Sequence, residues 1–202
     1  MKLYDTKTAP NPRRVRMFIA EKGLDIPVVQ VDLLAKENYT PEFRARNPLG
    51  RVPVLELDDG TCIAETVAIC RYLEETHPHP PLMGTDAKDR AVVEMWQRRM
   101  ELEIFQPIAN VFVHTHDYFK GRVEQVPAYG EACRAHALAR MKWLDGELAS
   151  RTYVAGERFT IADITALCGI DWGRVTSTRV PPECTNLLRW HALVSTRPSA
   201  KA

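Results

Sequence analysis

Two short motifs in the first third of the sequence contain residue types that could hold a small charged ligand. Glu65 and Thr66 stand where a predicted strand gives way to a predicted helix. The first N–H groups of a helix have no partner within the helix, and together with the helix dipole they favour an anion. A carboxylate beside them would accept hydrogen bonds from an ammonium group. The pair therefore suits a ligand end with both an α-carboxylate and an α-amine, although Glu65 and Thr66 could instead only cap the helix.

Val52 and Pro53 form a second motif, at the start of another predicted strand. A proline at this point cannot donate a hydrogen bond to a neighbouring strand. One interpretation is an ordinary edge strand. The other is a cis peptide bond, which would turn the main-chain groups of Val52 toward the main chain of a ligand. The residues by themselves leave both interpretations open.

The elements that must position these motifs follow the order β-α-β-α-β-β-α. Strands are predicted at 2–5, 26–33, 51–57 and 61–65, and helices at 12–23, 40–46 and 66–77. The helices rest on apolar residues at i, i+3 and i+4, and the Asp-Asp-Gly sequence at 58–60 is a hairpin signal between the last two strands. A parallel pair followed by an antiparallel hairpin predicts a mixed sheet that helices must cover.

Beyond these elements the strand patterns end and the sequence predicts an all-α domain. Prolines 78, 80 and 81 indicate a linker. Helices are predicted at 86–118, 127–149, from 159 onward and at 182–195, with Pro107 expected to kink the first of them. Thr160 and Asp163 predict a capping box at the start of the third helix. The expected division is an α/β domain at 1–78, a linker at 79–86 and an all-α domain at 87–202.

The composition narrows the class of partner and the compartment. A net charge of +1, from 27 basic and 26 acidic residues, gives no strong field for nucleic acid or an anionic membrane. Five cysteines without a CxxC pair favour a reducing compartment, and neither a secretory signal nor a membrane span is predicted, so we expect a cytoplasmic protein. No metal site is expected, because His114 and His116 would point to different faces of a helix.

The sequence resembles the cytosolic glutathione transferases over nearly its whole length. The resemblance rests on three stretches, which are LYDTKTAPNPRRVRMFIAEKG, NPLGRVPVLELDDGTCIAET and ERFTIADI. It implies a thioredoxin-like first domain with a cis-proline at Pro53, an all-helical second domain and a homodimer. It also implies that glutathione is the co-substrate.

The resemblance assigns roles to individual residues of the first domain. Val52 would pair with the cysteinyl main chain of glutathione, while Glu65 and Thr66 would hold its γ-glutamyl end. Arg51 occupies the place of a basic residue that reaches the glycine carboxylate in several classes of the family. Asn38 falls where some classes use a polar side chain for the same purpose.

The group that activates the thiol departs from the family's usual pattern. Most members supply a Tyr or Ser hydroxyl or a Cys, but Ala9 occupies the usual Ser or Thr position here. The Ala-Pro-Asn turn is similar to one found in some bacterial and fungal members, in which case the amide of Asn11 would donate to the sulfur. Alternatively the donor, or a water that it holds, comes from the long helix, where His114 is the candidate. A third possibility is a protein that binds glutathione without turnover.

The resemblance favours an enzyme that adds the glutathione thiolate to small apolar electrophiles. Two alternatives stay open at this point. One is glutathione-dependent reduction of peroxides or disulfides, which would use the same site. The other is a non-catalytic glutathione-binding or adaptor protein. The presence of both the Val52-Pro53 and Glu65-Thr66 motifs argues against an adaptor, whereas Ala9 argues weakly for one.

Overall fold

The computed structural model describes residues 1–202 and contains two compact units. The N-terminal unit comprises Met1–Pro81 together with Pro198–Ala202, and the helical unit comprises Leu82–Arg197. The first boundary falls within the predicted linker. The last five residues belong to the N-terminal unit, whereas the sequence assigned them to the second domain. None of the helices is long and apolar enough to cross a membrane.

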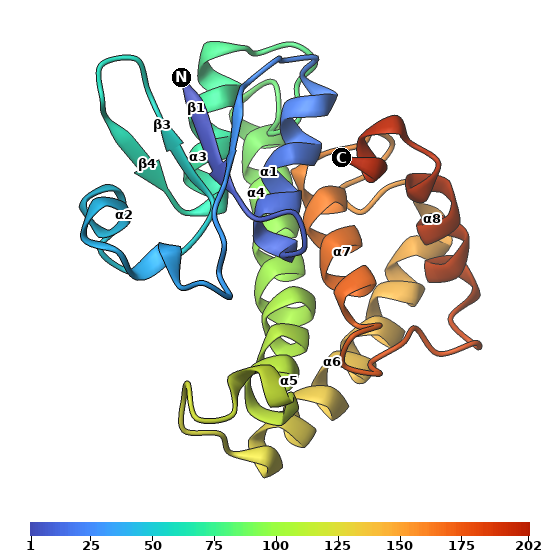
Figure 1. The fold of residues 1–202 in the computed structure, drawn as a ribbon. Coiled ribbons are helices and arrows are strands. Elements are labelled where there is room, and N and C mark those ends of the chain that lie inside the picture. Colours follow the sequence, from blue (N-terminus) through green and yellow to red (C-terminus); the bar gives the residue numbers. More distant parts are fainter. The chain divides into compact units, whose positions relative to one another are not determined.

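The N-terminal unit is built on a four-stranded mixed sheet in the order β2-β1-β3-β4 (Figure 1). The strands are β1 (Lys2–Asp5), β2 (Val28–Gln30), β3 (Val54–Glu56) and β4 (Cys62–Ala64), and the helices are α1 (Pro10–Glu21), α2 (Pro41–Arg46) and α3 (Thr66–Thr76). A 3₁₀ turn, η1 (Glu37–Tyr39), precedes α2, and another, η5 (Pro198–Lys201), lies against α1. β1 pairs parallel with β2 and antiparallel with β3, which pairs antiparallel with β4. The predicted element order and mixed sheet are confirmed.

The two faces of the sheet are covered by different helices. Tyr4 and Val54 share one face because they are directly paired across β1 and β3. Phe43 of α2 packs on this face, with its ring edge-on to Tyr4 at a centroid distance of 6.1 Å. Leu3 and Leu55 alternate to the opposite face and are fully buried, where α1 and α3 pack side by side (Figure 1).

The strands are shorter than the sequence predicts. The strand expected at 26–33 is limited to the three exposed residues of β2, while Ile26 and Val31 on either side are buried. The strand expected at 51–57 begins only at Val54, because Pro53 has no N–H to donate to the ladder. Hydrophobic pattern therefore predicted the strands but not how far pairing extends.

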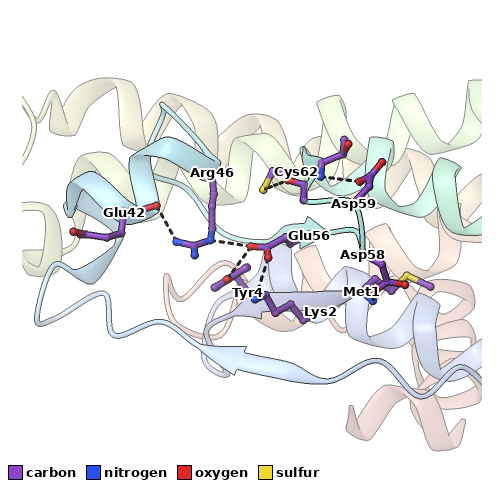
Figure 2. A network of polar contacts seen from close by, with 11 residues as sticks. Met1, Lys2, Tyr4, Glu42, Arg46, Glu56, Asp58, Asp59 and Cys62 are labelled. Atoms are coloured by element: carbon purple, nitrogen blue, oxygen red, sulfur yellow. Dashed lines mark hydrogen bonds and ion pairs between the residues drawn. The ribbon is translucent and has the colours of Figure 1, made fainter.

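A polar network ties the α2-covered face together around Glu56 (Figure 2). The Tyr4 hydroxyl and the Arg46 Nε–H both donate to Glu56 Oε2 at 2.9 Å, and Lys2 Nζ lies 3.0 Å from Oε1. The Arg46 guanidinium also lies 4.8 Å from the centroid of the Tyr4 ring. Hydrogen bonds from Lys2 and then Arg46 lower the pKa of Glu56 to about 2. The carboxylate thereby joins β1, β3 and α2.

The helical unit contains no strand among the named elements, as the sequence predicts. It consists of α4 (Ala87–Arg99), the π-helical segment η2 (Met100–Phe105), α5 (Gln106–Thr115), η3 (Asp117–Phe119), α6 (Pro127–Glu147), η4 (Leu148–Ser150), α7 (Ile161–Trp172) and α8 (Thr185–Ser195). Elements η3 and η4 are 3₁₀ turns.

The predicted helix at 86–118 is interrupted in two ways. Its turns become π-helical immediately before Pro107, which is how the chain accommodates a residue without an N–H inside a helix. The helix ends at Thr115 rather than 118, because His116 is extended at φ −92° and ψ 139°. The His116 Nδ1 then accepts a hydrogen bond from the Tyr118 N–H at 3.1 Å.

The start of α7 organises the helical unit. Thr160 and Asp163 form the predicted capping box, which is confirmed. The carboxylate of Asp163 is fully buried and accepts from the Thr160 and Val154 N–H groups at 2.9 Å and from the Trp190 indole at 2.8 Å. The Thr160 hydroxyl also donates to it, at 3.2 Å. Burial raises the pKa of Asp163 to about 6, which leaves the group mainly ionised at neutral pH.

Glu56→Gln should lower stability at neutral pH by about 1 to 2 kcal/mol, after allowing for the partial exposure of the network. The folded pKa of about 2 is below the unfolded value, so the stabilisation by Glu56 is present above the unfolded pKa and is lost as the pH falls toward 2. Urea unfolding at several pH values should show the difference from wild type narrowing below about pH 4. Glu42→Gln is the matched control, because only the carbonyl of Glu42 contacts Arg46; a constant Glu56→Gln deficit down to low pH would contradict the assignment.

Asp163→Asn should destabilise the protein by about 3 to 5 kcal/mol, because an amide nitrogen would face donors that have no other acceptor. Thr160→Ala, which removes only the cap hydroxyl, should cost about 1 kcal/mol. Denaturant unfolding of both variants measures this. Equal losses would mean that the Asp163 carboxylate contributes no more than the Thr160 hydroxyl does to the capping box.

Candidate active site

Two helices of the N-terminal unit begin without a side-chain cap. The Thr40 hydroxyl caps α2 by accepting from the Phe43 N–H at 3.3 Å. In contrast, Ala9 before α1 and Glu65 before α3 make no side-chain cap hydrogen bond. The positive ends of α1 and α3 are thus the ones available to an external anion.

The first turn of α1 offers few main-chain donors. Pro10 and Pro12 have no N–H, and the N–H groups of Ala9 and Arg13 donate to Thr6 and Ala9 carbonyls. Asn11 therefore carries the main-chain N–H that the helix start leaves over. Because the prolines on either side have no N–H, the N–H of Asn11 is the main-chain donor that remains at the start of α1.

The side chain of Asn11 is oriented by a buried arginine. Arg14 donates from Nη1 to Asn11 Oδ1 at 3.2 Å, and Arg14 is only 3% exposed. Because a guanidinium can only donate, the atom that faces it must be the amide oxygen. The Asn11 amide nitrogen consequently points away from Arg14 and makes no hydrogen bond to the protein. This role of Arg14 was not predicted from the sequence, although its i, i+3 spacing from Asn11 was a signal for it.

The junction between β4 and α3 has an unusual backbone. Glu65 has φ +68° and ψ 122°, a conformation that costs a non-glycine residue on the order of 1 to 3 kcal/mol. Its side chain is exposed and does not cap the helix, so the interpretation of Glu65 as a simple cap is wrong. Thr66 is buried and begins α3. A strained residue at an open helix start is the kind of feature that a ligand site retains.

The Val52–Pro53 peptide bond is cis, as expected from the resemblance. Val52 is half-buried and precedes β3, so its main-chain groups are outside the ladder. Arg51, next to it, is exposed and its guanidinium has no partner in the protein. A second cis bond, between His79 and Pro80, was not predicted.

Asn38 and His114, like Asn11, make side-chain contacts within the protein. Asn38 is buried and its Nδ2 donates to the Gly50 carbonyl at 2.7 Å, while its Oδ1 is buried without a partner. His114 accepts at Nδ1 from the Val126 N–H at 3.1 Å, which links the end of α5 to the residue before α6, and its ring lies edge-on to Tyr129. Both side chains thus make hydrogen bonds within the protein. No group of three or more His, Cys, Asp or Glu side chains is placed to hold a metal ion.

The comparisons with known proteins agree with this arrangement. The family model of the glutathione S-transferase N-terminal domain matches residues 1–75, and that of the C-terminal domain matches residues 108–198. Glutathione S-transferase 2 from Saccharomyces cerevisiae is 39% identical over 205 residues, covering 100% of this chain and 88% of that protein.

Solved structures give the same result. A glutathione S-transferase domain-containing protein from Marinobacter aquaeolei VT8 has a TM-score of 0.94 at 40% identity, covering 98% of this chain and 99% of that one. A glutathione S-transferase from Methylobacillus flagellatus, solved with GSH bound, has a TM-score of 0.84 at 27% identity, covering 99% and 96%. With matches in both halves and a relative that spans the whole chain, this protein belongs to the glutathione S-transferase family.

Proposed function

We propose that this protein binds glutathione on its N-terminal unit, activates the thiol with Asn11 and transfers the thiolate to small apolar electrophiles. The observation that carries the proposal is the orientation of Asn11, whose amide oxygen is held by Arg14 and whose amide nitrogen is left to donate. The relative from Methylobacillus flagellatus, which was solved with GSH bound, supports the choice of ligand.

The γ-glutamyl end of glutathione matches the open start of α3. Its α-carboxylate would accept from the unpaired N–H groups that begin at Thr66, where the helix dipole also favours negative charge. Its α-amine would donate to the exposed carboxylate of Glu65. The negative and positive groups of the γ-glutamyl end would thus each meet a group of opposite charge, at the start of α3 and at Glu65.

The other end of the tripeptide matches the segment before Pro53. The cysteinyl main chain would pair with the main chain of Val52, which the sheet does not use. The glycine carboxylate would pair with the exposed guanidinium of Arg51, which can form two parallel hydrogen bonds to it. Asn38 was expected to share this second task, but its buried amide is bonded to Gly50, so we assign the carboxylate to Arg51 alone.

Asn11 can make the thiolate common at neutral pH. A free thiol has a pKa of about 8.5, and one hydrogen bond to a charged acceptor contributes about 1.5 to 3 kcal/mol, or roughly one to two pKa units. The start of α1 adds about 0.3 to 1 kcal/mol for an anion beside it. A hydroxyl at position 9 is therefore not required.

In the reaction the sulfur of the thiolate attacks an electrophilic carbon and a C–S bond forms. The displaced electron pair leaves with the leaving group, or moves onto a neighbouring carbon that then takes up a proton. His114 is the weaker candidate for thiol activation, because its Nδ1 is already occupied by Val126. The expectation of a cytoplasmic homodimer remains part of the proposal and rests on the family resemblance.

Asn11→Ala should raise the pKa of the bound thiol by about one unit or more, because its main stabilising donor is removed. Titration of the thiolate absorbance in the glutathione complex measures the shift. His114→Ala is the control and should leave this pKa unchanged. An unchanged pKa in Asn11→Ala together with a raised pKa in His114→Ala would transfer the role to His114.

Glu65→Gln should weaken glutathione binding by roughly ten- to a hundred-fold, since it removes a charged acceptor while keeping the side chain's size. Calorimetric titration with glutathione measures the loss. A glutathione analogue without the α-amine is the control, because it cannot donate to residue 65 and should bind the two proteins equally. A similar loss for both ligands would contradict the assigned contact.

A further inference from the structure

The loop that the proposed function uses for glutathione is held by two buried asparagine side chains. Asn38 Nδ2 donates to the Gly50 carbonyl at 2.7 Å, and Asn47 Nδ2 donates to the Arg51 carbonyl at 2.8 Å. Asn38 and Asn47 are 6% and 4% exposed. Two successive carbonyls, immediately before Val52, are therefore each fixed by a side-chain amide.

Asn47 also fixes the beginning of the loop. Its main-chain carbonyl accepts from the Gly50 N–H at 2.8 Å, and its Oδ1 accepts from the Leu49 N–H at 3.1 Å. Its own N–H donates to the Phe43 carbonyl at 3.0 Å as the last bond of α2. One residue thus connects the end of α2 to three successive residues of the loop.

Gly50 lets the loop lie directly against η1. It has φ +61°, and a Cβ there would lie 2.8 Å from the Asn38 carbonyl oxygen and 3.0 Å from the Tyr39 ring. Only glycine combines this conformation with this approach. The main chain at residue 50 therefore packs against the backbone of η1 and is hydrogen-bonded to the Asn38 amide.

Neither asparagine is placed to bind the ligand itself. The amide nitrogen of each gives one hydrogen to a loop carbonyl, and both side chains are buried. Asn38 Oδ1 is also buried and, as an acceptor, could not bind a carboxylate. The sheet offers no alternative support, because the β3 ladder begins only at Val54.

We propose that Asn38 and Asn47 are positioning residues that fix the main chain of Arg51 and Val52 and so set the affinity for glutathione without touching it. The inference rests on the proposed function of those two residues. A loop that is already ordered loses less conformational entropy when the ligand binds, and its carbonyl and N–H directions are set in advance. Removal of either amide should therefore weaken the binding of glutathione and leave the rate of the chemical step unchanged.

Asn47→Ala and Asn38→Ala test the inference by steady-state kinetics and calorimetric titration with glutathione, well below each variant's unfolding midpoint. We expect Kd and KM for glutathione to rise roughly tenfold, with kcat and the pKa of the bound thiol nearly unchanged. Asn47→Asp, which keeps the acceptor for Leu49 but cannot donate to Arg51, should show the same rise and serves if Asn47→Ala fails to fold.

Thr40→Ala is the matched control, because it removes the N-cap of the same helix α2 but no bond to the loop. It should lower the unfolding midpoint and leave Kd unchanged. Asparagine variants that also lose stability at unchanged Kd would overturn the positioning role while leaving the proposed function intact. Failure of the wild-type protein to bind glutathione would overturn the proposed function, and the inference with it.

Discussion

The loop that precedes β3 depends on Pro53, which has no main-chain N–H. Because this residue cannot donate to the ladder, β3 begins at Val54 and the segment before it leaves the sheet. The polar groups of that segment still need partners, and the carbonyls of Gly50 and Arg51 find them in buried side chains. What remains unused is the main chain of Val52 and the guanidinium of Arg51, and these are the groups that a peptide-like ligand could use.

The helix starts of the N-terminal unit differ in whether a side chain caps them. Helices α2, α4 and α7 are closed by the side chains of Thr40, Asp86 and Thr160. Helices α1 and α3 of the N-terminal unit have no such cap, and neither do α5, α6 and α8 of the helical unit. At α1 two prolines reduce the main-chain donors to that of Asn11, and at α3 a strained Glu65 takes the place of a cap. The unit thus leaves its two electropositive helix ends open, and these could receive the thiolate and the γ-glutamyl carboxylate of glutathione.

In the helical unit, by contrast, a charged side chain is buried and bonded within the protein. The carboxylate of Asp163 is completely buried and surrounded by donors from three separate places in the chain, at the start of α7, at Val154 and at Trp190 of α8. Such a group serves to hold elements together, and its raised pKa follows from burial rather than from any chemistry at a site. His114 also connects two parts of the chain, because its hydrogen bond joins α5 to the residue before α6.

The sequence by itself determined the order of the elements and the capping box at Thr160, because each depends on residues within a few positions of one another. The mixed sheet followed from that order, whereas the cis bond at Pro53 was expected only from the family resemblance. It did not determine how far strands pair, where the helix before His116 ends, or what Asn38 does. Asn38 and Gly50 are 12 residues apart, and Asp163 and Trp190 are 27 apart. Only the tertiary structure brings such groups together, and burial then decides whether a polar side chain meets a ligand or holds the loop that does.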